Sequence, residues 1–366
     1  MKFLHYMPIK SDLYNGGTIR MINESSDFNS NEHAFFVKYP VGIEDIDNYN
    51  NVHLKPSISI ADFIQFEKDY DYIILHAWSI PYTQQPFIPK KVAKKMIWCV
   101  WGHDLYKLYN AEINGGIKNR IIKFLIKTIQ IPLIKNIFAI CYSFPYDRKE
   151  IFKVYGSRMR AFHVSYDFGH DADTLISEAK GKRQSNNLKV MVGHSSYPFL
   201  NHIHILEKLK KYEGEALEIY LPLNYGDMVY KDKVKKYCET YPIEVHILEE
   251  KLSKEAYVSY LSNIDVAIMD FKHQAAVGNV YLLILLNKKV YANGEGIIYK
   301  GLKEAEIEIF DSRKIGEINF SEFADMTYEK GSGQKWVREM VDLKETKLRW
   351  KKLFDYCKAE EENRRI

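Results

Sequence analysis

The chain has 366 residues, enough for two domains of ordinary size, and 46% of them are hydrophobic and 27% charged. This composition excludes a disordered, collagenous or low-complexity chain. The N-terminus lacks the apolar run of a signal peptide, and no stretch reaches the ~18 uninterrupted apolar residues of a membrane span. The four cysteines are widely spaced without a CxxC pair, which predicts a cytoplasmic protein with reduced thiols and neither disulfides nor a zinc site.

Short apolar runs rich in β-branched and aromatic residues alternate with helical segments in the first half of the chain. This alternation is typical of βαβ units on a parallel sheet. Asn15, Gly16 and Gly17 follow the first run, and we expect them in its loop. The predicted strands are Phe3–Tyr6, Phe35–Lys38, Tyr72–His76, Met96–Val100, Phe138–Tyr142 and Ala161–Val164.

Basic residues are concentrated in the segment from Tyr72 to Tyr146, which we call the basic segment. This segment contains ten Lys and Arg residues but only two acidic residues, Asp104 and Glu112. Its net charge is therefore +8, although the whole chain carries +4. The partner of this segment should be anionic. Nucleic-acid motifs do not accompany the charge, so an anionic membrane surface or a diphosphate-bearing substrate fits it better.

One helix is predicted inside the basic segment, and Pro132 should end it. Arg120, Lys123 and Lys127 are spaced i, i+3, i+7, which puts them on one stripe. Two compatible interpretations remain open: a crossover helix packed on the sheet, and a basic stripe that faces anionic lipid. The apolar side of this helix would consist of Ile121, Ile122, Leu125, Ile126 and Ile129.

The alternating pattern restarts after a polar linker at 171–187. Five strands are predicted in the runs LKVMV, ALEIYLPL, IEVHIL, VAIMDF and KVYAN. We therefore expect an α/β protein with an N-terminal Rossmann-like domain (1–170), a second one (188–334) and a C-terminal helix (335–366) that crosses back. The predicted helices are His202–Tyr212, Tyr230–Thr240, Lys254–Leu261, Gly278–Leu286 and Lys335–Glu361.

Three loops of the second half should meet at the carboxyl edge of its sheet, where ligands bind in such folds. They contain Gly193-His194-Ser195-Ser196, Pro222–Gly226, and Lys272–Val277 before a helix that begins near Gly278-Asn279. Glycine admits a ligand close to the backbone, and a helix N-terminus binds phosphate. An ordinary strand-to-helix turn, and close packing at Gly278, are the structural alternatives, but three such loops together favour a nucleotide site. GxGxxG and the Walker motif are absent.

In the first half, His76 ends a strand, and His103 and Asp104 follow another. Asp104 is our first candidate for a general base that takes the proton of a hydroxyl, with His76 and His103 in reserve. The structural alternatives are a satisfied, half-buried His76 and an Asp104 that caps the following helix.

The runs VGHSSYPFLNHIHIL, LPLNYG and LEEKLSKEAYVSYLSNIDVAIMDFKHQAAVGNVYLLI, with the earlier LHAW and VWGHDLY, resemble glycosyltransferases of family 56. These enzymes move N-acetylfucosamine from a TDP-sugar to a lipid-linked disaccharide in enterobacterial common antigen assembly. The resemblance is densest over 188–293. It implies the GT-B fold, in which two Rossmann-like domains face a central cleft and the C-terminal one holds most of the donor.

Position by position, the resemblance implies a donor turn with Gly193, Ser195 and His202, followed by Tyr225 in the next turn. Glu250, Lys251 and Leu252 would hold the nucleotide base, and Gln274 and Gly278 the diphosphate, while Asp104 matches the acid of the N-terminal domain. The sequence departs from the family at His194, at the run 197–200 and at Asn279-Val280, so the sugar and the nucleotide could differ from those of the family.

The expected activity is a nucleotide-sugar-dependent glycosyltransferase that acts on an undecaprenyl-diphosphate-linked saccharide. It would be peripheral on the cytoplasmic face of the inner membrane and bind no nucleic acid. We expect neither a metal nor another cofactor, since GT-B enzymes generally work without a bound metal. No glutamate lies between Glu255 and Glu295, which favours an inverting displacement. The alternative is a nucleotide-sugar epimerase of the same two-domain fold, which would turn over donor without an acceptor.

Overall fold

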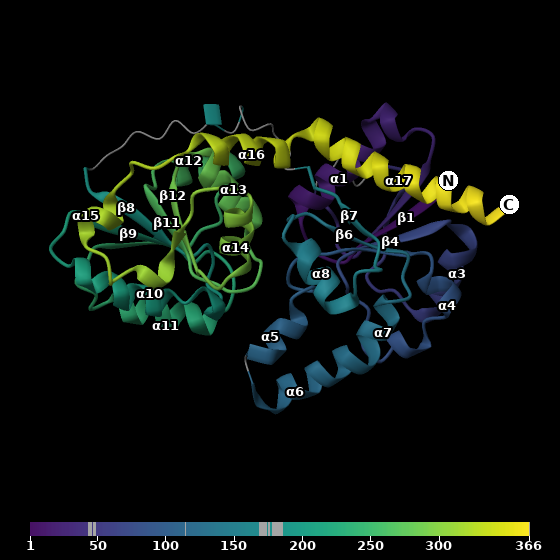
Figure 1. The fold of residues 1–366 in the computed structure, drawn as a ribbon, viewed down its shortest axis with the longest axis horizontal. Helices are drawn as coiled ribbons and strands as arrows, with labels where there is room; N and C mark the ends of the chain where they lie inside the picture. Colours follow the sequence, from purple (N-terminus) through teal and green to yellow (C-terminus); the bar gives the residue numbers. More distant parts are fainter. Residues whose placement is uncertain are drawn as a thin grey trace. The chain divides into compact units, whose positions relative to one another are not determined.

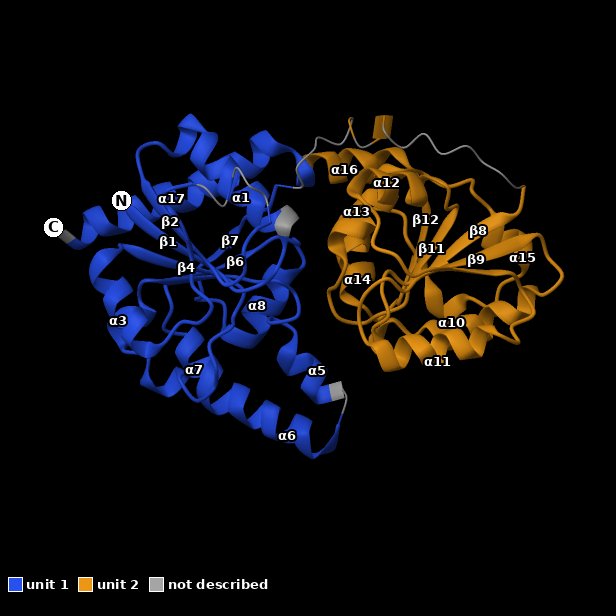
Figure 2. Cartoon of the chain, turned by 180° about the vertical axis from the view of Figure 1, so that it is seen from behind, with its two compact units in different colours: residues 1–170, 340–366 blue, residues 171–339 orange. Residues whose placement is uncertain are grey.

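Two sheets of parallel strands, one in each half of the chain, organise the structure (Figure 1). The computed structural model describes residues 1–42, 46, 49–113, 115–167, 174, 176–177 and 186–365. Unit 1 comprises Met1–His170 together with Met340–Ile366, and unit 2 comprises Asp171–Glu339 (Figure 2). The predicted linker at 171–187 lies almost entirely outside the described residues.

Among the described residues, unit 1 contains a seven-stranded sheet of order β3-β2-β1-β4-β5-β6-β7. The strands are β1 (Lys2–Met7), β2 (Glu32–Val37), β3 (Val52–Leu54), β4 (Tyr72–His76), β5 (Met96–Cys99), β6 (Ala139–Tyr142) and β7 (Ala161–His163). The helices are α1 (Asp12–Glu24), α3 (Ile60–Asp69), α4 (Lys90–Ala93), α5 (Lys107–Ile113), α6 (Gly116–Leu125), α7 (Ile131–Ile134), α8 (Asp147–Tyr155) and α17 (Leu343–Arg365). The single-turn helices η1 (Ser26–Phe28) and η2 (Gln85–Phe87), and a π-helical segment η3 (Ile126–Gln130), complete unit 1.

The C-terminal helix α17 returns to unit 1 and packs on one face of its sheet (Figure 1). Trp350, Leu353 and Phe354 join the same buried cluster as Phe3 and Ile74 of the strands. The single helix predicted over Lys335–Glu361 is wrong in one respect, because the structure has two. The side chain of Asp342 accepts a hydrogen bond from the Glu345 amide (2.7 Å), which starts a new helix at that point.

Unit 2 contains, in its described part, a six-stranded sheet of order β10-β9-β8-β11-β12-β13. The strands are β8 (Leu188–Val192), β9 (Leu217–Pro222), β10 (Val245–Leu248), β11 (Val266–Met269), β12 (Lys289–Ala292) and β13 (Phe310–Asp311). Helices α10 and α11 cover one face, and α12 and α13 the other (Figure 1). The helices are α10 (His202–Leu209), α11 (Met228–Cys238), α12 (Lys254–Ser262), α13 (Val277–Leu285), α14 (Ile297–Glu304), α15 (Phe320–Ala324) and α16 (Gly331–Val341), with single turns η4 (Pro198–Leu200), η5 (Lys210–Tyr212) and η6 (Ser312–Lys314).

In both sheets the first strand in chain order lies in the interior, and the order in which later strands are added reverses once beside it. In unit 2 the first strand β8 lies between β9 and β11, and in unit 1 the first strand β1 lies between β2 and β4. At such a reversal the two flanking connections run over opposite faces, which leaves a crevice at the carboxyl ends of the two central strands. Each unit therefore has one favoured ligand position.

Two predictions about unit 1 are corrected by the structure. Asn15, Gly16 and Gly17 lie inside α1 rather than in a loop, because Ser11 caps that helix and the missing Cβ of Gly17 leaves room for Asp167 (2.8 Å from its carbonyl oxygen to an added Cβ). The helix predicted up to Pro132 divides into α6, η3 and α7, and Pro132 lies in the first turn of α7.

Candidate functional site

The loops after β8 and β11 form the reversal point of unit 2, and a glycine shapes the first of them. Gly193 has φ +68°, and a Cβ on it would lie 2.5 Å from Nε2 of His202. The imidazole of His202, the first residue of α10, thus packs directly on the Gly193 backbone. Any other residue at position 193 would strain the backbone and displace this ring.

Several buried polar atoms at this edge have no hydrogen-bond partner among the described residues. They are Nδ1 of His194, both ring nitrogens of His202, and Oδ1 of Asn224. Burial lowers the pKa of His194 and of His202 to about 4, each with a further contribution from a neighbouring histidine, so both rings are neutral at pH 7. Because an unsatisfied buried group costs free energy, such a cluster is typical of a surface that pairs with a ligand.

Two helix N-termini begin at the same edge with unusual caps. The N-cap residues Asn201 of α10 and Ala276 of α13 are both left-handed, with φ of 55° and 51°, and neither makes a side-chain cap hydrogen bond. The N-cap side chains therefore accept no hydrogen bond from the first backbone N–H groups of either helix, although in α10 the Tyr230 hydroxyl interacts with the amides of His202 and Ile203. The first N–H groups of α13 follow an N-cap residue that has no polar side chain. Together with the helix dipoles, they form a place for a negatively charged group.

Asp270 holds this arrangement together, although we did not single it out from the sequence. Its Oδ1 accepts hydrogen bonds from Asn293 (2.9 Å) and Ser312 (2.5 Å), and its Oδ2 accepts one from Asn201 (3.1 Å). Asn201 is thus turned away from its own helix and does not cap α10 with its side chain. An aspartate directly after a buried strand was the available signal, but its partners lie up to 69 residues away.

Aromatic side chains border the edge on its exposed side. Tyr197 stacks on Phe199 (5.6 Å between ring centroids) and meets Tyr225 edge-on, and Phe199 contacts His273. Tyr197 is 40% exposed and Tyr225 50%, which is unusual for rings that could be buried. They offer planar faces to a nucleobase or a sugar ring.

The remaining predicted donor residues fall in two places. Ser195 is fully buried behind the Gly193 turn, Gln274 is buried in the loop before α13, and Gly278 and Asn279 lie in the first turn of α13. Glu250, Lys251 and Leu252 follow β10, which is separated from β8 by β9. These three residues thus follow the carboxyl end of the edge strand β10 in the same sheet.

In unit 1, Asp104 is buried and both its oxygens accept hydrogen bonds. Oδ2 accepts from the Trp78 amide and the Trp98 indole (2.7 Å each), and Oδ1 from the amides of Trp101 and Leu105 (2.8 and 3.0 Å). These four donors fix the loops after β4 and β5. The neighbouring His103, by contrast, is exposed.

His76 belongs to a buried chain of hydrogen-bonded rings beneath α17. Its Nε2 pairs with Nδ1 of His5 (3.0 Å), whose Nε2 pairs with Nδ1 of His33 (3.0 Å). On the other side, Nδ1 of His76 pairs with the Tyr166 hydroxyl (3.1 Å), which also accepts a hydrogen bond from Trp101 (2.9 Å). Burial lowers the pKa of all three imidazoles, that of His76 to about 3, so the chain is uncharged at pH 7.

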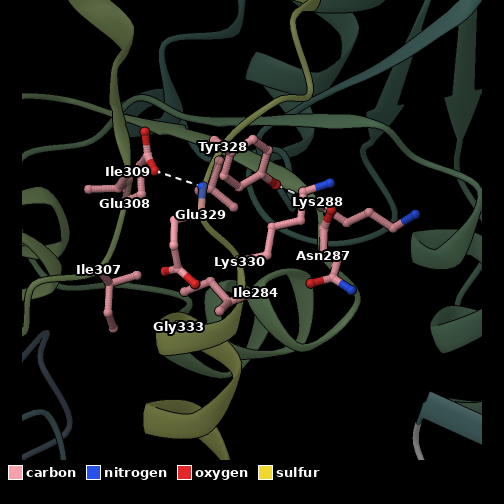
Figure 3. Close-up of a pocket in the computed structure, with 11 residues that line it drawn as sticks. Ile284, Asn287, Lys288, Ile307, Glu308, Ile309, Tyr328, Glu329, Lys330 and Gly333 are labelled. Carbon is pink, nitrogen blue, oxygen red and sulfur yellow. Dashed lines mark hydrogen bonds between the residues drawn. The ribbon is translucent and has the colours of Figure 1, made fainter.

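A small hollow in unit 2 lies elsewhere (Figure 3). It is lined by residues just before β12, such as Lys288, just before β13, such as Glu308, and by Tyr328 and Lys330. This is the amino edge of the sheet, opposite the loops described above, and its sides are closed by hydrogen bonds from the Glu329 amide to Glu308 and from Tyr328 to the Asn287 carbonyl. It is not the candidate site.

Two α/β units, each with a parallel sheet whose strand order reverses once, are typical of the GT-B fold, and the comparisons agree. The structure resembles Alr3699/HepE of Anabaena in complex with UDP-glucose (TM-score 0.65, 13% identity, 97% of this chain and 100% of that chain covered). It also resembles a sucrose-phosphate synthase of Thermosynechococcus elongatus (0.65, 9%, 98% and 100%) and a glycosyltransferase of Rickettsia africae (0.61, 11%, 98% of each).

The family model "4-alpha-L-fucosyltransferase glycosyl transferase group 56" matches residues 87–322. The chain therefore belongs to glycosyltransferase group 56. In the described part of the chain, no helix combines the length and apolarity required to cross a membrane.

Proposed function

We propose that the protein transfers a deoxyamino sugar from a nucleotide sugar, with TDP as the nucleotide, to a saccharide carried on a lipid diphosphate in bacterial surface polysaccharide synthesis. The observation that carries the proposal is the pair of helix N-termini without an N-cap side-chain hydrogen bond, beside unsatisfied neutral histidines in unit 2, in a chain of group 56. The UDP-glucose complex of Alr3699/HepE supports a nucleotide-sugar donor.

In this proposal the donor diphosphate lies against the first turns of α10 and α13, where backbone amides and helix dipoles stabilise its charge. The same groups stabilise the diphosphate as it leaves, so the transfer needs no bound metal. His194 gives and accepts hydrogen bonds to the donor as a neutral ring, and the fully buried His202 supports the Gly193 turn. Tyr197, Phe199 and Tyr225 offer stacking faces to the base or the sugar.

For the acceptor, we assign proton removal to His103 and loop positioning to Asp104. Of the three candidates, only His103 is exposed, whereas Asp104 and His76 are buried and hydrogen-bonded. The acceptor oxygen forms the new bond to C1 of the sugar while the bond from C1 to the phosphate oxygen breaks, which inverts the anomeric centre. The proton goes to His103, and the electron pair stays on the departing diphosphate. The net charge of the basic segment supports a location at the cytoplasmic face of the inner membrane, where such a lipid carrier would lie.

A ligand panel tests the donor assignment. TDP should raise the melting temperature of the intact protein, because only the folded state binds it. The increase should be larger than with UDP, GDP or CMP if TDP is the donor nucleotide. If UDP alone stabilises the protein, the donor nucleotide is UDP rather than TDP. If none of the four ligands stabilises it, the proposed nucleotide site in unit 2 is contradicted. With a TDP-sugar, product should form only when a saccharide on a lipid diphosphate is added. The reaction should also proceed when EDTA is present, because the proposed transfer needs no metal. Conversion of the donor without acceptor would instead indicate an epimerase.

A further inference from the structure

We infer that α6 is a lipid-inserting element, which docks unit 1 on an anionic bilayer by three apolar side chains and their basic flanks. The inference deepens the proposed function and rests on it in one respect: a lipid-diphosphate acceptor stays in the bilayer, so the enzyme must reach it there. The sequence alone indicated a basic stripe at this position. The structure shows that Ile121 of the predicted apolar side is exposed beside it together with Ile117 and Phe124, which changes the kind of contact from electrostatic attraction to insertion.

The apolar stripe consists of Ile117, Ile121 and Phe124. They are 77%, 55% and 64% exposed, and their i, i+4, i+7 spacing puts them on one face of the helix. None of the ten residues of α6, all of which the structure describes, is buried. α6 contacts α5 and η3 at the margin of unit 1, away from the sheet (Figure 1). A helix that leaves its largest apolar residues in water is typical of an element with a partner.

The charges beside the stripe identify the partner. Lys118 and Arg120 flank the apolar face on its two sides and make no ion pair among the described residues, while Lys123 and Lys127 share the single carboxylate of Glu112 (3.2 and 3.3 Å). An apolar stripe between cationic margins complements the interface of an anionic bilayer, where acyl chains lie below phosphate groups. Lysine and arginine reach the phosphates with their charged ends while their stems cover the acyl region.

A second exposed aromatic residue supports the same surface. Phe87 in η2 is 68% exposed, and η2 packs against η3, the continuation of α6. The next helix, α4, begins with Lys90 and Lys91. An exposed aromatic residue close in sequence to lysines is thus also present on an element that contacts the continuation of α6.

Sedimentation with vesicles of phosphatidylcholine, alone or mixed with phosphatidylglycerol, tests the inference on the full chain. The wild-type protein should bind the anionic vesicles, and replacing Ile117, Ile121 and Phe124 together with Ser should weaken binding by about tenfold or more. Lys118→Glu with Arg120→Glu should also weaken it, and only at low salt. In a Phe124→Trp variant, brominated lipid should quench the added fluorescence, which a purely electrostatic contact would not produce.

Leu54→Ser and Val229→Ser are matched controls, because both residues are exposed (59% and 82%) but lie outside this surface. Their vesicle binding should equal that of the wild type. Unchanged binding of the triple serine variant, or equal binding to neutral vesicles, would overturn the inference. So would a dimer that the serine changes dissociate, since a second copy would then cover the stripe. Transfer to a saccharide on a water-soluble, short-chain lipid diphosphate should be equal in wild type and triple variant. Its absence from both would refute the proposed function instead.

Discussion

Asp104 shows how one carboxylate can be taken for a catalyst when it serves the backbone. Its four hydrogen bonds come from two backbone loops and one indole, and each oxygen needs to be an acceptor. An amide at this position must turn its NH₂ group toward two N–H donors. Asparagine is therefore not a neutral replacement here, although it has the same shape.

We expect Asp104→Asn to lower the free energy of unfolding by at least about 1–3 kcal/mol, because buried donors lose their acceptor. His103→Gln should leave that free energy unchanged and reduce turnover by roughly 100-fold or more, the usual contribution of a general base. Urea unfolding and initial-rate assays of the same preparations separate the two. Normal turnover of His103→Gln would contradict the assignment, and full stability of Asp104→Asn would contradict the positioning role.

The buried histidines should make the protein acid-sensitive. His202 has a pKa of about 4 in the folded state and 6.5 as its ordinary value, so the unfolded chain binds a proton that the folded one refuses between these values. Stability is therefore full above pH 6.5 and falls as the pH drops toward 4.

His202→Gln should reduce the slope of unfolding free energy against pH by up to one proton, about 1.4 kcal/mol per pH unit. The matched control is His204→Gln, two residues along the same helix but exposed, which should leave the slope unchanged. Urea unfolding at a series of pH values measures it. Equal slopes in the two variants would show that burial of His202 is not the cause.

At the scale of elements, the proposed nucleotide binding depends on the N-termini of α10 and α13 rather than on the lengths of these helices. Both helices begin after a left-handed residue, directly beyond the two central strands of the sheet. Gly278 lies in the first turn of α13, where a branched side chain would cover the exposed amides.

Gly278→Val should therefore weaken nucleotide binding by about tenfold or more without unfolding unit 2, since the loss of charged hydrogen bonds alone amounts to 1.5–3 kcal/mol or so. Titration calorimetry with the stabilising nucleotide measures the affinity, and circular dichroism checks the fold. Gly331→Val, in the first turn of α16, is the control and should bind normally. Equal affinity of both variants would place the diphosphate elsewhere.

The periodicity of the sequence was sufficient for the central strands, because they are buried on both faces and so form continuous apolar runs. Tyr72–His76 and 188–192 match β4 and β8 residue for residue. The edge strands β3 and β13 were missed, since two or three residues with half-buried or exposed side chains have no such pattern. The apolar side predicted for the basic helix was also partly misplaced, because Ile121 faces solvent.

For the site, the sequence predicted which loops meet, since the carboxyl ends of parallel strands lie at one edge. It could not predict that Asn201 turns toward Asp270, or that His202 packs on Gly193. Those contacts depend on tertiary packing between segments far apart in the chain. The hydrogen bonds that both carboxylate oxygens of Asp104 accept could not be predicted either, because their donors come from two separate loops.

At the scale of the whole molecule, the last helix belongs to the first fold unit. Trp350 of α17 is fully buried, donates a hydrogen bond to the Ser165 carbonyl (2.8 Å) and lies against the ring of His76. Unit 1 is therefore complete only when the C-terminus of the chain has been made.

We expect Trp350→Ala to destabilise unit 1 by about 3–5 kcal/mol, the usual cost of removing a buried large aromatic ring. Nucleotide binding, which we place in unit 2, should persist under native conditions. Leu348→Ala on the same helix is the control, because Leu348 is 41% exposed, and it should change stability little. Urea unfolding followed by tryptophan fluorescence measures both. A wild-type midpoint for Trp350→Ala would show that α17 is not needed by unit 1.

The chain from His33 to Tyr166 has a polarity. Each neutral imidazole carries one N–H and one lone pair, so the hydrogen bonds between His33, His5 and His76 must all point the same way. In one sense of direction the Tyr166 hydroxyl donates to His76. In the other it accepts from both His76 and Trp101, and its own proton turns elsewhere. The three tautomers therefore switch together or not at all, and the state of His33 is transmitted to Tyr166 across three strands without any movement of the backbone or any net charge.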